Sequence, residues 1–242
     1  MTDLDLLESL LSCNTIDDLH FTTSKIIRQM GYEHFIYGVR VITSLAHPYQ
    51  FIFSGYPKEW RSRYIEAGYE EIDPTVHHCI KNKSVIPIIW NDHLFKTQRL
   101  AQLMDEAKQF GLANGVSLAV HGGRGESAML SMSTSYSSAK AKQIIIKNLG
   151  KAQLLACYLH EAVQRIVLTK EAFPLAQVEL TNREKECLLW AAEGKTSWEI
   201  AHIIGTSERT VIFHLQNVSR KLGVSSRQHA IARAISMGLV TI

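Results

Sequence analysis

Residues 194–223 read GKTSWEIAHIIGTSERTVIFHLQNVSRKLG, and this stretch decides the fold of the C-terminal part of the chain. The Thr-Ser pair at 196–197 offers two candidate caps for a short helix, and Gly205 supplies a tight turn. Ser207 then caps a second helix, which Gly223 ends. A short helix, a glycine turn and a second capped helix form the layout of a helix-turn-helix.

The second helix of this pair separates inward from outward positions. Val211, Leu215, Val218 and Leu222 recur at helical spacing and face inward. The second helix of such a pair fits the major groove of DNA, where arginine and glutamine can make bidentate contacts to guanine and adenine. The outward positions are Arg209, Ile212, Phe213, Gln216 and Arg220. The expected DNA-binding residues are Lys195, Thr196, Arg209, Thr210, Ile212, Phe213, Gln216, Arg220 and Lys221.

Charge supports a phosphate-facing surface at this end of the chain. Residues 209–242 contain five basic residues and neither Asp nor Glu, although the formal net charge of the whole chain is only +3. We expect Lys195, Arg220 and Lys221 to contact phosphates, and Thr196 to offer its hydroxyl or its backbone N–H. A solvated cationic helix face would produce the same charge pattern and remains an alternative.

Two further helices complete an all-helical domain over residues 179–242. Thr181 and Glu184 have the spacing of a capping box at the start of the first, which Gly194 ends. Ser225 or Ser226 caps the last helix. Residues 169–178 include Pro174 and lack helical periodicity, so they are expected to form a linker.

Residues 1–168 mix helical and strand patterns and indicate an α+β domain, an α/β/α sandwich with a central antiparallel sheet. Strands are expected at 35–43, 50–54, 85–90, 115–120 and 127–133, and helices at 98–110 and 139–168. The last helix carries a heptad-like apolar seam and a second strip that includes Leu154, Leu155 and Tyr158. One strip is expected on the sheet, and the other either belongs to the core or forms a dimer interface.

Three C-terminal segments carry a family resemblance. LTNRE at 180–184, GKTSWEIA at 194–201 and TVIFHLQNV at 210–218 resemble the LuxR-type helix-turn-helix. The resemblance implies a DNA-binding dimer on inverted repeats, with Glu184 as part of the scaffold. It also implies double-stranded promoter DNA and RNA polymerase as partners. Ile212 stands where a basic residue is common in this family.

The N-terminal part resembles the autoinducer-binding domain of acyl-homoserine-lactone receptors, through YPKEWRSRY at 56–64, GYEEIDPTV at 68–76 and Trp90. The resemblance implies an N-acyl-homoserine lactone as ligand, with a long 3-oxo chain, and no other cofactor. The implied ligand-binding residues are Tyr56, Trp60, Arg61, Tyr64, Asp73, Thr75, Trp90 and Ser131.

The chemistry of these side chains suits such a ligand, because every buried polar group needs a partner. Asp73 can accept from the amide N–H, Trp60 can donate to the lactone carbonyl, and Tyr56 and Ser131 can donate to the acyl carbonyl. Trp90 offers a flat wall beside the lactone ring. Arg61 and Thr75 could hold a water near a 3-oxo group. Candidate tail-channel residues are Ile36, Val39, Ile52, Val76, Leu112 and Leu130.

Each of these residues also has a purely structural explanation. Trp60 and Tyr64, four positions apart, could pack a helix on the sheet, and Asp73 before Pro74 is a good N-cap without any ligand. The alternative function is a LuxR-type regulator that responds to another small hydrophobic signal or acts without one.

Several other classes of function are not expected. The GKTS at 194–197 ends like a P-loop, but the required first glycine is Leu189 and no strand precedes it. The adjacent His77, His78 and Cys79 point apart on one helix, so no metal site is expected. Neither an HxHxDH motif nor a GxSxG motif occurs, so we expect no enzyme. The scattered cysteines, the acidic N-terminus and the lack of a long apolar run predict a cytoplasmic protein.

Overall fold

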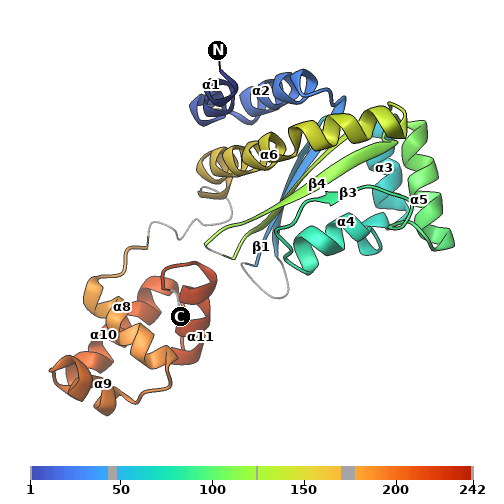
Figure 1. Cartoon of the computed structure of the whole chain (residues 1–242). Coiled ribbons are helices and arrows are strands. Elements are labelled where there is room, and N and C mark those ends of the chain that lie inside the picture. The colour runs from blue at the N-terminus through green and yellow to red at the C-terminus, as the bar shows by residue number, and fades with distance from the viewer. Residues whose placement is uncertain (1, 43–47, 124, 170–177, 241–242) are drawn as a thin grey trace. The chain divides into compact units, whose positions relative to one another are not determined.

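The computed structural model describes residues 2–42, 48–123, 125–169 and 178–240. The chain divides into two compact units (Figure 1). The first comprises Met1–Arg40, Gln50–Gly122 and Glu126–Leu168, and the C-terminal helices lie in the second. Of the expected linker at 169–178, residues 170–177 lie outside the described residues, as do residues 43–47 with the end of the expected first strand.

A five-stranded sheet forms the centre of the first unit within the described part of the chain, in the order β2-β1-β5-β4-β3. Its strands are β1 (His34–Val41), β2 (Tyr49–Ser54), β3 (Ile88–Ile89), β4 (Asn114–His121) and β5 (Ser127–Thr134). The pairs β1–β5, β4–β5 and β3–β4 are antiparallel, as expected. The expected strand at 85–90 shrinks to two residues, because Pro87 has no N–H to donate to a ladder and Val85 and Ile86 lie exposed.

Helices cover both faces of this sheet, which confirms the α/β/α architecture (Figure 1). One face carries the long helix α6 (Ser138–Val163), which continues as a π-helical turn η4 (Gln164–Leu168); α1 (Asp3–Glu8), η1 (Ser9–Ser12) and α2 (Ile16–Gln29) contact α6. On the other side lie α3 (Lys58–Glu66), η2 (Tyr69–Glu71), α4 (Pro74–Val76), η3 (His77–Lys81) and α5 (Gln98–Gln109).

The apolar seam of α6 faces its own domain. Ile145, Ala152, Ala156, Leu159 and Val163 are all buried. Leu155, which belongs to the second strip, is also completely buried, whereas Leu154 is 51% exposed. The seam therefore belongs to the core. The large apolar side chains of α6 that are exposed, Ile146 and Leu154, form an outward strip.

The second unit is all-helical, as expected, with α8 (Asn182–Ala192), α9 (Ser197–Ile204), α10 (Glu208–Leu222) and α11 (Arg227–Ser236). Thr181 with Glu184 and Thr196 with Glu199 form capping boxes at α8 and α9, and Ser226 caps α11. Gly205 adopts a left-handed conformation, φ +66°, between α9 and α10, where a side chain would be strained.

Among residues 2–42, 48–123, 125–169 and 178–240, no helix combines the length and the apolar character needed to span a bilayer.

Candidate ligand site and DNA-binding surface

A cavity of about 370 Å³ lies in the first unit, between the sheet and the helices α3, α4 and α5. The structure brings all eight sequence-predicted ligand residues to its wall: Tyr56, Trp60, Arg61, Tyr64, Asp73, Thr75, Trp90 and Ser131. They come from four separate segments of the chain, so only the tertiary fold assembles them. The volume lies within the range of small-molecule sites.

Asp73 serves as a helix cap and as a polar group of the cavity wall. Its Oδ1 accepts from the backbone N–H and the hydroxyl of Thr75, at 2.8 and 2.7 Å, and its Oδ2 accepts from the Tyr64 hydroxyl at 2.9 Å. A carboxylate has about four lone-pair sites, so Asp73 can accept one further hydrogen bond. The Thr75 hydroxyl uses its only hydrogen in the bond to Asp73, so toward a ligand it can act only as an acceptor.

Tyrosine hydroxyls around Asp73 are held in their neutral, proton-donating form. Burial raises the pKa of Tyr64 above its ordinary value, and the charge of Asp73 raises it further. Burial likewise raises the pKa of Tyr56. The Tyr56 hydroxyl oxygen is buried and makes no hydrogen bond of ordinary geometry among the described residues, although the nearby Ser133 hydroxyl, itself without a partner, opposes the effect of burial on its pKa. It is therefore a donor in need of an acceptor.

Aromatic rings surround the buried Trp60 and hold its indole in place. Its ring centroid lies 5.9 Å from Tyr64, 6.1 Å from Tyr69 and 5.7 Å from Phe110. Trp60 is a core residue, as its spacing to Tyr64 predicted, and it also lines the cavity. The packing and the ligand-facing role are therefore compatible.

A chain of hydrogen bonds links the side chains of Trp90, Ser117 and Ser131 at the cavity wall. Trp90 Nε1 donates to Ser117 Oγ at 2.9 Å, and the Ser117 and Ser131 hydroxyls are 2.7 Å apart. Ser117 pairs with Ser131 across the β4–β5 hairpin, so the register orients both side chains to one face. The sequence analysis missed Ser117, although the expected hairpin register could have paired it with Ser131.

Trp90 packs directly on β4 because residue 115 is a glycine. A Cβ at Gly115 would lie 2.9 Å from the Trp90 ring and 2.6 Å from the Met132 carbonyl oxygen. Both approaches are closer than a real Cβ tolerates, so the flat wall that Trp90 presents to the cavity depends on Gly115.

Five of the six candidate tail-channel residues line the cavity, and one does not. Ile36, Val39, Ile52, Val76 and Leu112 line the cavity. Leu130 does not, because successive residues of a strand point to opposite faces of the sheet. Ser131 faces the cavity, and Leu130 therefore lies opposite Tyr37, whose hydroxyl bonds to His160 of α6.

The sequence analysis also missed cavity residues that α5 contributes. Leu103, Met104 and Ala107 line the cavity from one face of this helix. Their helical spacing was visible, but nothing in it distinguishes a cavity wall from ordinary core.

The outward face of α10 is exposed, as its periodicity predicts. Arg209, Ile212, Phe213, Gln216 and Arg220 are all accessible, with Phe213 57% and Ile212 41% exposed. Thr210 lies at the helix start, where its backbone N–H donates to the Ser207 hydroxyl at 3.2 Å. The inner residues Val211, Val218 and Leu222 are buried in the core of the domain.

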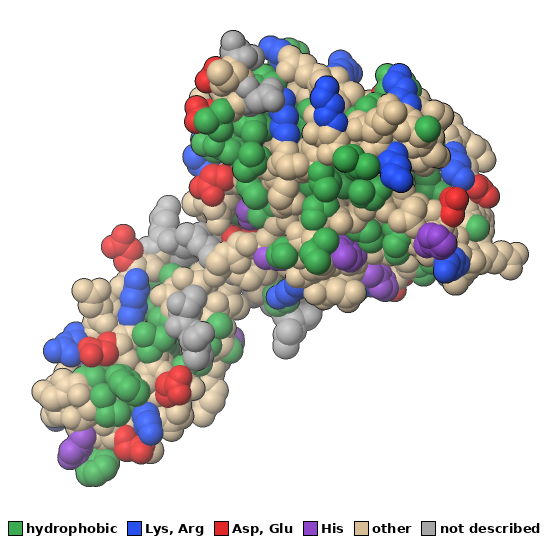
Figure 2. All heavy atoms as spheres, viewed as in Figure 1, with side chains coloured by type: hydrophobic (Ala, Val, Ile, Leu, Met, Phe, Trp, Pro, Cys, Tyr) green, Lys and Arg blue, Asp and Glu red, His purple; other side chains and the backbone are tan. Residues whose placement is uncertain are grey.

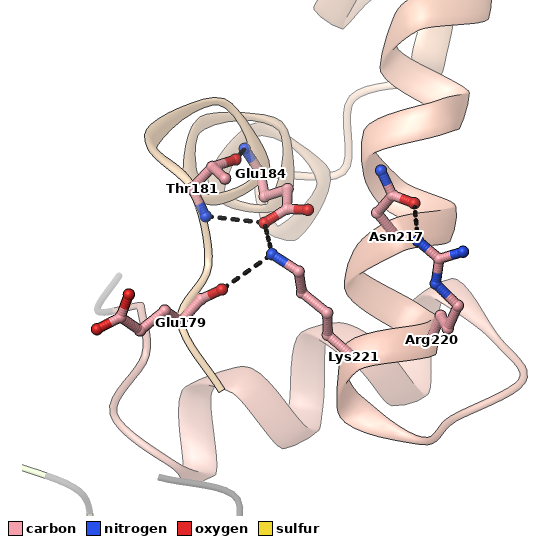
Figure 3. A network of polar contacts seen from close by, with 6 residues as sticks. All are labelled: Glu179, Thr181, Glu184, Asn217, Arg220 and Lys221. Atoms are coloured by element: carbon pink, nitrogen blue, oxygen red, sulfur yellow. Dashed lines mark hydrogen bonds and ion pairs between the residues drawn. The ribbon is translucent and has the colours of Figure 1, made fainter. Parts of the chain in front are cut away.

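The structure gives Lys221 a partner within its own domain (Figure 3). Its Nζ donates to Glu184 Oε2 at 2.7 Å and to the Glu179 carbonyl at 2.9 Å. Burial raises the pKa of Glu184, but the Lys221 ammonium and the Thr181 backbone N–H outweigh it and hold the pKa below its ordinary value. Lys221 therefore has an acidic partner within its own domain, whereas its neighbour Arg220 bonds only to the neutral Asn217 in the network drawn.

Thr196 is bonded within the cap of its own helix. Its hydroxyl and its backbone N–H both donate to Glu199 Oε2, at 2.8 and 2.7 Å. Both groups that were expected to contact a phosphate are thus committed to the cap of α9. Lys195 keeps its side chain near the start of α9, and its carbonyl accepts from Arg227.

The side chains once considered as a metal cluster diverge. His77 Nε2 lies 2.6 Å from the Glu71 carbonyl oxygen, and His78 Nε2 lies 2.8 Å from that of Ile86. Cys79 is completely buried.

Comparisons with known proteins match both units. The family model "Autoinducer binding domain" covers residues 15–163, and the model "Bacterial regulatory proteins, luxR family" covers residues 178–234. The chain is 36% identical to the transcriptional activator protein AnoR of Acinetobacter nosocomialis, over 98% of each protein. It is 38% identical to the transcriptional activator protein VanR of Vibrio anguillarum, over 93% of this chain and 91% of that protein.

Solved structures agree with these sequence matches. A crystal structure of Escherichia coli SdiA superposes with a TM-score of 0.77 at 27% identity, covering 99% of this chain and 98% of that one. A structure of SdiA in complex with octanoyl-rac-glycerol gives a TM-score of 0.75 at 28% identity, covering 98% of this chain and 94% of that one.

Proposed function

Because this chain belongs to the luxR family of bacterial transcriptional activators and carries an autoinducer-binding domain, we propose that its ligand is an N-acyl-homoserine lactone. Members of this family are transcription factors, which confirms that the chain is not an enzyme. One observation carries the proposal. A single apolar cavity holds a carboxylate with spare acceptor capacity, Asp73, beside a buried, unpartnered donor, Tyr56.

The proposed pose assigns each polar group of the lactone to one side chain. The amide N–H donates to Asp73, the lactone carbonyl accepts from Trp60, and the acyl carbonyl accepts from Tyr56 and Ser131. Trp90 covers the lactone ring. Tyr64 and Thr75 orient Asp73 through the hydrogen bonds described above, and Arg61 reaches the cavity from the exposed side of α3.

The acyl chain then extends along β1 and β2, between Ile36, Ile52 and Val76. Ile52 is more than half exposed, so the channel opens toward solvent rather than ending in a closed wall. This supports a long chain, and a 3-oxo group would lie near the acyl carbonyl, where Arg61 could bind it through a water.

Binding of the lactone would stabilise the first unit and favour a homodimer on an inverted repeat of promoter DNA. Figure 2 shows hydrophobic side chains reaching the surface of the first unit among Lys and Arg side chains. Ile146, 59% exposed, and Leu154 supply such side chains on α6, and we propose this strip as the dimer contact. Arg209 and Gln216 would read bases from α10, and the activator would contact RNA polymerase in the cytoplasm.

The test is ligand capture. The full chain is produced in cells supplied with a mixture of acyl-homoserine lactones, purified, extracted with organic solvent and analysed by mass spectrometry. One lactone is expected at about equal molar amount with the wild type and to be lost with Asp73→Asn. Asp105→Asn, at an exposed position on α5, is the matched control. Extracts without any lactone would refute the proposal.

A second candidate ligand class is favoured by the SdiA structure that contains octanoyl-rac-glycerol. A monoacylglycerol offers hydroxyl donors and one carbonyl, and it could use the same Asp73 and Tyr56 groups. Recovery of a monoacylglycerol by the wild type in the absence of lactones, and its retention when lactones are added, would support this class instead.

A further inference from the structure

The cavity wall carries a cationic side chain, Arg40, on the strand that the acyl chain is proposed to follow. Arg40 lies near the end of β1 and lines the cavity. Its Nε is buried and has no hydrogen-bond partner among the described residues, and none of the ion pairs found there includes its guanidinium. A cationic donor therefore lies at the wall of a largely apolar cavity, whose other charged lining residues are Arg61, Glu70, Asp73 and Lys81.

Arg40 is distant from the groups that would bind the lactone. Ile36 pairs with Ser131, and Arg40 follows four residues later on the same face of the strand. Four residues of strand span about 13 Å. An extended alkyl chain advances about 1.25 Å per C–C bond, so about ten bonds reach the level of the Arg40 backbone.

Midway between the two ends, the strand carries no side chain on the cavity face. Gly38 lies between Ile36 and Arg40, and a Cβ there would already be 3.6 Å from Ile52. A larger side chain would fill the channel. On the neighbouring strand β2, Gln50 also lines the cavity and is exposed, so the far end is polar as well as accessible.

A plain alkyl tail is a poor occupant of this far end. A methyl group cannot accept a hydrogen bond from the Arg40 guanidinium, and it would displace the water that can. An oxygen on the tail would satisfy the donor, and hydrogen bonds with a charged partner are the stronger kind.

We infer that Arg40 binds an oxygen acceptor on the acyl chain, remote from the lactone. The ligand class is then an acyl-homoserine lactone that carries a hydroxyl, oxo or carboxylate group near the end of its tail. This inference rests on the proposed function, and it makes Arg40 the residue that determines specificity for the tail.

The test compares decanoyl-homoserine lactone with its ω-hydroxy and ω-carboxy forms. Dissociation constants are measured with the full chain by ligand-induced thermal stabilisation. The wild type is expected to bind the oxygenated forms about ten- to hundredfold more tightly than the plain form. Arg40→Met, which keeps much of the side-chain volume, is expected to abolish this preference. Arg28→Met, which removes an exposed charge outside the cavity, is expected to retain it.

Arg40→Gln is a second variant that keeps the inference testable if Arg40→Met folds poorly. Glutamine keeps a neutral hydrogen-bond donor at this position. It is expected to retain part of the preference for the hydroxyl and to lose the preference for the carboxylate. A wild type that binds the plain decanoyl lactone at least as tightly as the oxygenated forms would overturn the inference alone. If none of the three lactones binds the wild type, the proposed function fails and the inference fails with it.

Discussion

At the scale of single residues, each polar group of the cavity has a role set by the hydrogen bonds that it already makes. Asp73 is held by Tyr64 and Thr75, which fix the direction of its carboxylate. Tyr56 makes no such bond among the described residues and is available as a donor. The difference between a supporting and a ligand-binding side chain therefore lies in its unused hydrogen-bonding capacity.

Asp73→Asn is expected to raise the lactone concentration for half-maximal response about ten- to hundredfold, because a charged acceptor is lost. Asparagine caps helices as well as aspartate, so the start of α4 should persist. The measurement is a lactone-dependent reporter at matched protein level, with Asp105→Asn as control. An unchanged half-maximal concentration would remove Asp73 from the ligand site.

Gly115→Ala is expected to weaken lactone binding without touching a polar contact. The added methyl would meet the Trp90 ring and the Met132 carbonyl, so Trp90 must move from its place on the cavity wall. Overpacking of this kind costs about 1–3 kcal/mol. The checks are the unfolding midpoint of the ligand-free chain and the lactone dissociation constant. Gly123→Ala meets no neighbouring atom and is the control.

Glu184→Gln is expected to destabilise the C-terminal helices by about 1–3 kcal/mol, because a buried charge-assisted contact is lost. The pKa of Glu184 is lowered in the folded state, so its contribution is present above its unfolded pKa, near 4.3, and lost as the pH falls through the folded value. Denaturant unfolding of the full chain at several pH values would check this. The difference between wild type and variant should shrink as the medium becomes acidic; a constant difference would contradict the assignment.

At the scale of secondary-structure elements, α10 has one face that packs in the core of its domain and another face that is exposed and proposed to contact DNA. Adjacent residues of a helix point about 100° apart. Lys221 thereby meets Glu184, while Arg220 remains exposed beside Asn217. By charge alone, Arg220 and Lys221 are equally good candidates for phosphate contact. Their hydrogen-bond partners distinguish them, because Lys221 has an acidic partner and Arg220 a neutral one.

Arg220→Ala is expected to lower affinity for all DNA sequences and to reduce the salt dependence by about one unit of slope. Lys221→Met should instead lower stability and leave the slope unchanged, because Lys221 is bound to Glu184. Gel shifts with specific and scrambled sites at several salt concentrations separate the two. A wild-type slope for Arg220→Ala would mean that Arg220 does not contact phosphate, and a reduced slope for Lys221→Met would mean that Lys221 does.

Gln216→Ala is expected to relax base choice at one position of the site by about 1–3 kcal/mol, without a change in non-specific affinity. The same gel shifts, repeated with singly substituted sites, measure this. If only non-specific affinity falls, Gln216 does not read a base.

At the scale of the whole molecule, the proposed lactone would complete the core of the first unit, so we expect ligand binding to stabilise the folded chain. Plain lactones of ten to twelve carbons are expected to stabilise the chain more than those of four. Each buried methylene contributes about 0.8 kcal/mol, of which ordering of the tail takes back a part. Thermal unfolding with a lactone series would show this, and a maximum at four or six carbons would mean that the channel is closed.

The sequence by itself determined the local features, because their causes are local. The capping boxes of α8 and α9, the glycine turn at Gly205 and the inner stripe of α10 all depend on residues within a few positions of one another. The same holds for the fold class and for the family, whose motifs are contiguous segments. The eight proposed ligand residues, all of which line the cavity, could be named from such segments and from their chemistry.

The tertiary structure alone decided which neighbours each side chain has. It selected which face of β5 meets the cavity, so that Ser131 lines it and Leu130 does not, and it brought Trp90 to Ser117. It also paired Lys221 with Glu184 and left Arg220 without an acidic partner in the network drawn in Figure 3. Strand register and helix packing join residues that are far apart in the chain, and the free energy of those contacts depends on partners that periodicity cannot identify.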